Sequence, residues 1–281
     1  MTRSGSERWI VRSPAPNAAS RLVCFPYAGG GPAAFRPWAA EPPGEIEVCC
    51  VHLPGRESRL AEEPLRRFGP AVAAVVEALD AVEPPFSFFG HSLGALIAFE
   101  VTRALAARGL AGPTHLVVAG CHAPHLPTRR PWLHPLADTE FLERIRGLGG
   151  TPPEVLENDE LMSLLLPALR VDFELYETYR YEGGESLSIP ILALAGSDDP
   201  TTAPGAVAVW AEHTAAPFAF RVVPGEHFFP FTERRLVLAS IERFVAASGA
   251  AAVASSRSPR PTAAAVGGRP VVATTQGDRD D

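Results

Sequence analysis

The sequence predicts an α/β fold in which a mostly parallel sheet is covered by helices on both faces. Two observations support this prediction. Short apolar runs typical of strands alternate with segments whose apolar residues have helical spacing. The chain also has 281 residues, of which 46% are hydrophobic and 20% charged, enough to bury a sizeable core. The strands are expected at residues 21–25, 46–52, 86–89, 115–119, 191–195 and 218–223, and the main helices at 68–82, 93–107, 206–213 and 233–247.

Both ends of the chain are expected to lie outside this domain, which spans residues 20–247. Residues 1–19 are polar and contain Pro and Ala, so we expect a flexible arm. Residues 248–281 are rich in Ala, Ser, Gly, Pro and Arg, and such a segment buries too little apolar surface to offset the entropy of ordering. We expect a disordered tail there.

One segment interrupts the alternation of strands and helices. Between residues 124 and 188 the sequence contains no strand pattern, and it predicts short helices at 138–146, 153–157 and 159–181. We call residues 124–188 the helical insertion. An insertion at the carboxyl ends of the strands is expected to act as a lid, with helical packing against the core as the alternative.

Composition excludes several classes of function. The formal net charge is −7, whereas proteins that bind nucleic acid or an anionic membrane need a cationic surface. The sequence contains neither an apolar signal segment nor a run of about 18 apolar residues, so we expect a cytoplasmic protein. Four Cys residues lie in or beside apolar runs without a CxxC pair, which favours buried free thiols over a metal site.

The segment GHSLG at residues 90–94 matches the pattern G-x-S-x-G. It lies between an expected strand and an expected helix, which is the context of the nucleophile elbow in the α/β-hydrolase fold. In that turn the serine hydroxyl projects above the sheet at the positive end of a helix dipole. The sequence therefore predicts an α/β-hydrolase fold with Ser92 as its nucleophile.

A serine nucleophile needs a base and a group that orients it, and in this fold they follow in the order acid, then histidine. Two histidines come late enough in the chain. His213 lies in a helical pattern where a solvent-facing position explains it, whereas His227 lies in a loop after the last strand. We expect His227 to be the base. The loop after the strand 191–195 offers Asp198 and Asp199 as the acid, and spacing does not choose between them.

An oxyanion hole requires two backbone N–H donors. One is expected to be the amide of Leu93, directly after the nucleophile. The other should come from the loop after the first strand, FPYAGGG at residues 25–31, in which Ala28 is the candidate. A plain Gly-rich turn is the alternative, and the loop lacks both phosphate-binding patterns, GK[ST] and GxGxxG.

Five segments together resemble the type II thioesterases, the stand-alone editing enzymes of polyketide and nonribosomal peptide synthetases. They are FPYAGG at 25–30, LPGRE at 53–57, FGHSLG at 89–94, AFE at 98–100 and GEHFF at 225–229. The similarity runs from about residue 20 to 246. One departure is Leu93, which stands where many members carry Met and leaves the amide unchanged.

The resemblance implies a role for each site residue. Ser92 and His227 fall on the nucleophile and the base of the family, and the amides of Ala28 and Leu93 fall on its oxyanion hole. The family's acid is the fourth residue of a Gly-x-x-Asp turn, which is Asp199, and Asp198 ranks second. The helical insertion corresponds to a mobile lid over an acyl chamber. Lid residues such as Leu164, Leu165 and Leu169 are candidates to line that chamber, but the sequence does not fix the direction of their side chains.

The implied reaction is hydrolysis of short or aberrant acyl groups from the phosphopantetheine arm of acyl or peptidyl carrier proteins. No metal or dissociable cofactor is implied, and a monomer is expected. A carboxylesterase acting on free esters, a product-releasing thioesterase and a non-catalytic binding protein are the alternatives. Carrier proteins are usually acidic, so docking would require a local basic patch, for which the candidates are Arg129, Arg130, Arg144 and Arg146. An ordinary solvated surface is the alternative explanation of these arginines.

Overall fold

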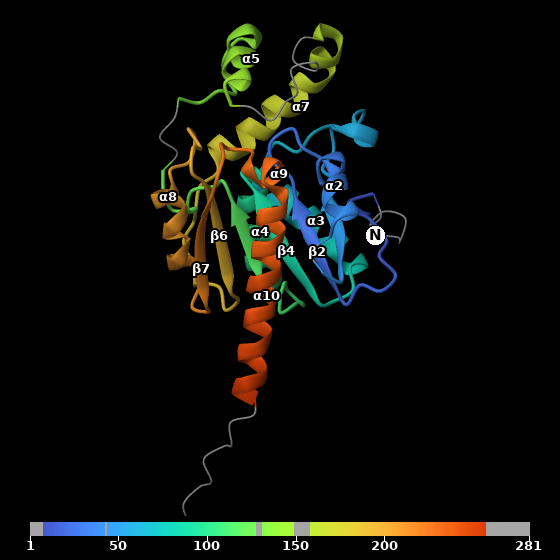
Figure 1. Cartoon of the computed structure of the whole chain (residues 1–281). Helices are drawn as coiled ribbons and strands as arrows, with labels where there is room; N and C mark the ends of the chain where they lie inside the picture. Colours follow the sequence, from blue (N-terminus) through green and yellow to red (C-terminus); the bar gives the residue numbers. More distant parts are fainter. Residues whose placement is uncertain (1–7, 43, 128–130, 149–157, 257–281) are drawn as a thin grey trace, which may run out of the picture.

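A seven-stranded sheet forms the centre of the computed structural model, which describes residues 8–42, 44–127, 131–148 and 158–256 (Figure 1). The strand order is β1-β3-β2-β4-β5-β6-β7, and neighbouring strands are parallel except for the antiparallel pair β1 and β3. The expected mostly parallel sheet is thus confirmed. The strands are β1 (Ile10–Arg12), β2 (Ser20–Phe25), β3 (Ile46–Val51), β4 (Phe86–His91), β5 (Leu116–Ala119), β6 (Ile191–Gly196) and β7 (Phe218–Val223).

Strand β1 corrects the prediction that residues 1–19 form a flexible arm. Ile10 is 3% exposed and lies opposite Val51 of β3, and the Arg12 guanidinium contacts the Glu47 carboxylate at 2.7 Å. A strand of three residues with one buried apolar side chain carries too little pattern to stand out in a polar segment. Residues 1–7 of the expected arm lie outside the described residues.

Side chains along the central strands alternate between two buried faces, as the pleat of a strand requires. Val23 and Phe25 of β2 belong to the apolar cluster that includes residues of α3 and α4. Leu22 and Cys24 belong to the cluster that includes residues of α2 and α10, and α10 crosses the front of the sheet in Figure 1. The helices of these layers are α2 (Arg36–Ala40), α3 (Phe68–Ala78), α4 (Leu93–Ala107) and α10 (Arg234–Ser256).

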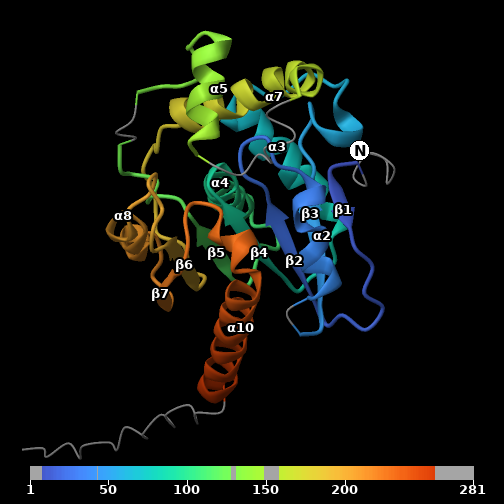
Figure 2. The same cartoon turned by 45° about the horizontal axis from the view of Figure 1, so that its top comes forward.

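The helical insertion lies between β5 and β6, and its helices α5 (Asp138–Arg146) and α7 (Asp159–Thr178) stand above the sheet (Figures 1 and 2). Phe141 and Ile145 of α5 pack in one apolar cluster with Leu169 of α7. The expected helix at 153–157 lies outside the described residues. Two short helices, α8 (Pro204–Ala208) and α9 (Phe229–Thr232), follow β6 and β7.

The C-terminal helix is longer than the sequence predicts. We expected it to end at residue 247, but α10 continues to Ser256, and residues 257–281 of the expected tail lie outside the described ranges. All four cysteines are buried free thiols, as expected. Within the described ranges, every helix falls short of the length and apolarity that crossing a bilayer would require.

Candidate active site

Ser92 occupies a strained turn between β4 and α4. Its backbone angles are φ 55° and ψ −120°, and a positive φ is unfavourable for a residue with a side chain. The Ser92 N–H donates a 2.9 Å hydrogen bond to the Ala119 carbonyl of the neighbouring strand, which helps hold the turn. Ser92 stands at the N-cap of α4, where the unpaired N–H groups and the helix dipole favour negative charge.

Two glycines flank this turn because the backbone leaves no room for a side chain. A Cβ atom on Gly90 would lie 2.5 Å from the Ala95 Cα atom of the following helix. A Cβ atom on Gly94 would lie 2.5 Å from the carbonyl carbon of Phe25 in β2. The glycines of the pattern therefore allow α4 to approach both β4 and the end of β2, where the loop 25–31 begins.

The structure brings His227 and Asp199 together. The Nδ1 atom of His227 lies 2.8 Å from Oδ2 of Asp199, and the two side chains are 11% and 0% exposed. Asp198 is exposed instead, and its carboxylate accepts a 2.7 Å hydrogen bond from the Ser197 hydroxyl. Of the two aspartates that the sequence left open, only Asp199 contacts the imidazole.

Thr201 is a site residue that the sequence analysis missed. Its backbone N–H and its hydroxyl donate hydrogen bonds of 2.7 and 2.6 Å to Oδ1 of Asp199, and its hydroxyl oxygen also lies 2.8 Å from Nδ1 of His227. Burial alone would raise the pKa of Asp199, but the hydrogen bonds from His227 and Thr201 outweigh it and keep that pKa below its ordinary value. An aspartate two residues before a threonine is a turn signal that points to this contact.

His91 forms a neutral neighbour for His227. The centres of the two rings are 4.8 Å apart, and the Nδ1 atom of His91 donates to the Ala119 carbonyl over 3.1 Å. Burial, followed by the nearby His227 ring, holds the pKa of His91 well below its ordinary value. A neutral ring here does not repel the positive charge that a base at His227 acquires when it takes up a proton.

Gly120 allows these rings to lie close to the strand ends. A Cβ atom there would be 2.7 Å from Cε1 of His91 and 3.4 Å from Cε1 of His227. Because Asp199 engages Nδ1 of His227, the Nε2 atom is the nitrogen left to accept a proton. Among the described residues no hydrogen bond joins this ring to the Ser92 hydroxyl, and such contacts commonly tighten only when substrate binds.

The structure describes both candidate donors of the oxyanion hole. Leu93 is the first residue of α4, where its N–H has no partner within the helix. Ala28 lies in the loop after β2 and is half-buried. In the described part of the chain, neither N–H takes part in a hydrogen bond, so both are free to donate to a developing oxyanion.

The insertion reaches this loop through one of the three leucines proposed to line the chamber. Leu169 of α7 is 7% exposed, and its Cδ1 atom lies 2.7 Å from the position that a Cβ atom on Gly29 would take. Leu164 is 58% exposed and faces solvent, and Leu165 is half-buried. Leu169 therefore lies directly over the loop that contains Ala28.

His213, the other late histidine, is buried rather than on a solvated face. It is 4% exposed, its Nε2 atom lies 2.7 Å from Nδ1 of His125, and its ring packs against Trp210. Burial, with His125 and Arg103 nearby, lowers the pKa of His213 to about 4. The helical spacing predicted a solvent-facing His213. That prediction was wrong because residues 209–213 form a tight 3₁₀ segment, which turns the side chains differently from an α-helix.

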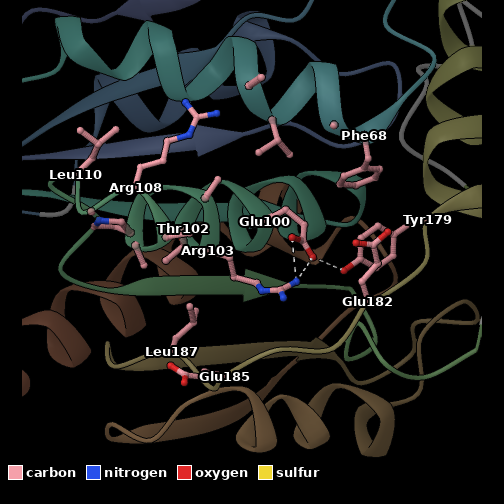
Figure 3. Close-up of a pocket in the computed structure, with 18 of the residues that line it drawn as sticks. Phe68, Glu100, Thr102, Arg103, Arg108, Leu110, Tyr179, Glu182, Glu185 and Leu187 are labelled. Atoms are coloured by element: carbon pink, nitrogen blue, oxygen red, sulfur yellow. Dashed lines mark hydrogen bonds and ion pairs between the residues drawn. The ribbon is translucent and has the colours of Figure 1, made fainter.

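A groove of about 1180 Å³ lies along α3, α4 and the segment after α7, with none of Ser92, Asp199 and His227 in its lining (Figure 3). In it, Glu100 of α4 contacts Arg103 at 2.9 Å and accepts a 2.7 Å hydrogen bond from the Tyr179 hydroxyl. The groove is thus separate from the candidate site, and its polar contacts attach the end of α7 to α4. Across the described residues, no three His, Cys, Asp or Glu side chains group in a way that could hold a metal ion.

Comparison with known proteins identifies the family. The family model of the thioesterase domain matches residues 20–245. The chain is 42% identical over 229 residues to the gramicidin S biosynthesis protein GrsT of Aneurinibacillus migulanus, covering 81% of this chain and 90% of GrsT. It is 43% identical over 224 residues to the thioesterase PikA5 of Streptomyces venezuelae, covering 79% of each chain.

The fold agrees with this assignment. The structure of BorB, a type II thioesterase from the borrelidin biosynthetic cluster, superposes with a TM-score of 0.77 at 36% identity, covering 84% of this chain and 96% of BorB. RedJ, a thioesterase of the prodiginine pathway in Streptomyces coelicolor, gives a TM-score of 0.75 at 39% identity, covering 82% and 87%. This chain therefore belongs to the thioesterase family, has its α/β-hydrolase fold, and is a thioester hydrolase similar to the family's type II members.

Proposed function

We propose that this enzyme removes short or aberrant acyl groups from the phosphopantetheine arm of carrier proteins in polyketide or nonribosomal peptide biosynthesis. The observation that carries the proposal is the 2.8 Å contact between His227 and Asp199, at the same edge of the sheet as the Ser92 turn. The names of its relatives, which place them in gramicidin S and borrelidin biosynthesis, support the substrate class.

In the proposed reaction, residues of this chain supply the nucleophile, the base and the oxyanion donors. Nε2 of His227 takes the proton of Ser92 as the Ser92 oxygen attacks the thioester carbonyl carbon. The resulting oxyanion accepts hydrogen bonds from the N–H groups of Ala28 and Leu93, each worth about 3 kcal/mol. When the C–S bond breaks, the imidazolium returns its proton to the leaving sulfur, and the acyl group remains as an ester on Ser92.

The second half of the cycle regenerates the serine. His227 removes a proton from water as the water oxygen attacks the ester, and the same proton then returns to the Ser92 oxygen as the carboxylic acid leaves. Asp199 stays ionised throughout and stabilises the positive charge on His227 in both halves. Its lowered pKa favours the carboxylate form that this role requires.

A basic patch for the carrier protein is part of the proposal. Arg129 and Arg130 lie outside the described residues, whereas Arg144 of α5 is 62% exposed and lies 3.9 Å from Glu140. We expect charge reversal at Arg129 and Arg130 to raise the KM for an acyl-carrier protein and to leave hydrolysis of a free acyl-pantetheine unchanged. An unchanged carrier KM would argue against docking at this patch.

The decisive assay compares the wild type with Ser92→Ala on an acetyl-loaded carrier protein. We expect release of acetate by the wild type and only background hydrolysis by the variant, and near wild-type release by the variant would contradict the proposal. A free ester of the same acyl group serves as the second substrate. A kcat/KM that is higher for the free ester would favour a carboxylesterase, and a clear preference for a long product-like chain would favour product release.

A further inference from the structure

A buried ion pair connects the helical insertion to the body of the enzyme. Asp172 of α7 is 1% exposed, and Arg56, which follows β3 in the LPGRE segment, is 4% exposed. Nη1 and Nη2 of Arg56 donate hydrogen bonds of 2.6 and 2.9 Å to the two oxygens of the Asp172 carboxylate. This bidentate geometry fixes the direction of both side chains as well as their distance.

The same carboxylate binds the loop of the candidate oxyanion hole. The N–H of Gly29, the residue after Ala28, donates a 2.6 Å hydrogen bond to Oδ2 of Asp172. Arg56 reinforces the contact by donating a 3.2 Å hydrogen bond to the Gly30 carbonyl. The peptide unit directly after Ala28 is therefore held by a side chain from α7, which is more than 140 residues away in the sequence.

The LPGRE segment also holds the turn that follows the loop 25–31. Oε1 of Glu57 accepts a 3.0 Å hydrogen bond from the N–H of Ala33. Gly29 itself has a φ of +79°, a conformation that glycine adopts without strain and that directs successive N–H groups differently from an extended chain. The backbone that follows the Ala28 N–H is thus held at residues 29, 30 and 33.

Several contacts of α7 with the body of the enzyme lie after Pro167, in residues 168–178, which we call the inner half of the helix. Pro167 interrupts the helical hydrogen bonding, and Asp172 lies about one and a half turns further on. Beyond the helix end the Tyr179 hydroxyl is bonded to Glu100 (Figure 3). Leu169 covers Gly29 between these points. A shift of the inner half of α7 would therefore remove both the Asp172 carboxylate and the Leu169 side chain from the loop that contains Ala28.

We propose that Asp172 is a positioning residue that couples the seating of α7 to the geometry of the oxyanion hole. With α7 seated, Asp172 holds Gly29 and Arg56 so that the Ala28 N–H points at the developing oxyanion. With α7 displaced, that donor loses its alignment, so the enzyme is fast only while the insertion covers the acyl group. The proposal rests on the function proposed above, because it assigns the oxyanion role to the Ala28 N–H.

The test uses Asp172→Asn, which keeps the shape of the side chain and removes its charge. We expect kcat on the acetyl-loaded carrier protein to fall by about tenfold to a hundredfold, with KM within about threefold, because displacement of a catalytic donor acts on the transition state. The matched control is Glu174→Gln on the same helix, whose exposed ion pair with Arg66 at 3.0 Å does not touch the loop. We expect the control to have wild-type kcat.

A second variant separates positioning from stability. Asp172→Asn leaves the charge of Arg56 buried without a partner, which destabilises the fold, whereas Arg56→Gln combined with Asp172→Asn removes both charges. We expect the double variant to regain thermal stability and to remain at least about tenfold slow in kcat. If the single variant does not fold, the double variant alone decides the question.

A trifluoromethyl ketone inhibitor provides the readout that a purely structural role would not change. Its adduct with Ser92 places an oxyanion in the hole, so Ki should rise by about the factor by which kcat/KM falls. Wild-type kcat in Asp172→Asn, or recovery of kcat together with stability in the double variant, would overturn the coupling. An inactive wild type would instead contradict the proposed function, which keeps the two failures distinct.

Discussion

The Nδ1 atom of His227 lies 2.8 Å from Oδ2 of Asp199, and the other oxygen of that carboxylate accepts three hydrogen bonds from residues 201 and 202. Both lone-pair regions of the carboxylate are therefore engaged, and the carboxylate cannot rotate away from the imidazole without losing several bonds. The consequence is a fixed ring orientation in which Nδ1 of His227 faces the carboxylate and Nε2 is the opposite ring nitrogen.

The two neighbouring aspartates should differ sharply on mutation. Asp199→Asn is expected to lower kcat for acyl-carrier hydrolysis roughly a thousandfold or more, because the amide neither selects the correct tautomer of His227 nor stabilises its positive charge. Asp198→Asn should remain within about twofold of the wild type, since among the described residues its carboxylate bonds only to the Ser197 hydroxyl. Steady-state kinetics on both variants check this, and the opposite ranking would reassign the acid.

The Thr201 hydroxyl should support catalysis by holding the Asp199 carboxylate. Thr201→Val removes the 2.6 Å hydrogen bond to Asp199 and is expected to lower kcat about tenfold, the effect of about 1.4 kcal/mol. Thr102→Val is the matched control, because that hydroxyl is also buried but bonds to the Ala98 carbonyl within α4. Equal activities of the two valine variants would show that the Thr201 hydroxyl does not support the carboxylate.

The close approach of α4 to β2 should make Gly94 intolerant of a side chain. Gly94→Ala would bring a methyl group within 2.5 Å of the Phe25 carbonyl carbon, so we expect a loss of about 3 kcal/mol or more in the free energy of unfolding. Gly112→Ala serves as the control, since a Cβ atom there meets nothing within 4 Å. Urea unfolding of both variants measures the difference, and similar stabilities would contradict the packing described here.

His213 should make the enzyme sensitive to acid. Its pKa in the folded enzyme is lowered to about 4, whereas a histidine in an unfolded chain titrates near pH 6.5. Between these values the unfolded chain binds a proton that folded His213 does not, so the free energy of unfolding falls as the pH drops from about 6.5 toward 4. Above about pH 6.5, His213 adds no pH dependence to the free energy of unfolding.

The measurement is the change in Tm between about pH 7.5 and about pH 5. We expect His213→Gln to have a lower Tm than the wild type at the higher pH, because it loses packing against Trp210, but to lose less Tm on acidification. His125→Gln is a useful second variant, since it removes the ring bonded to His213 and leaves the buried imidazole in place. An equal loss of Tm in the wild type and His213→Gln would exclude His213 as the source.

The sequence predicts the central sheet well because its signals are local. Six of the strands and the helix at residues 93–107 were expected within one or two residues, since each is a continuous apolar run or a periodic segment. Strand β1 was missed because its three residues include a single buried apolar side chain. The expected end of α10 at residue 247 was wrong because an Ala-rich segment has helical propensity as well as low hydrophobicity.

In the candidate site too, residues marked by a local pattern were predicted, whereas contacts between distant segments were not. Ser92, His227 and Leu93 follow from a motif and from chain order, and the choice of Asp199 over Asp198 came from the family resemblance, with which the contact to His227 agrees. By contrast, the contact between Arg56 and Asp172 joins residues 116 positions apart, and no local pattern pairs them. The buried position of His213 was likewise a tertiary property, set by packing against Trp210 and Tyr181.

The most direct test of the catalytic account is labelling with a fluorophosphonate followed by mass spectrometry of the peptide 68–103, which cleavage after arginine releases. The account predicts a single adduct on Ser92 and a labelling rate that falls at least about a hundredfold in His227→Ala, because the imidazole must remove the serine proton. No adduct on Ser92, or a labelling rate that is unchanged in His227→Ala, would contradict it.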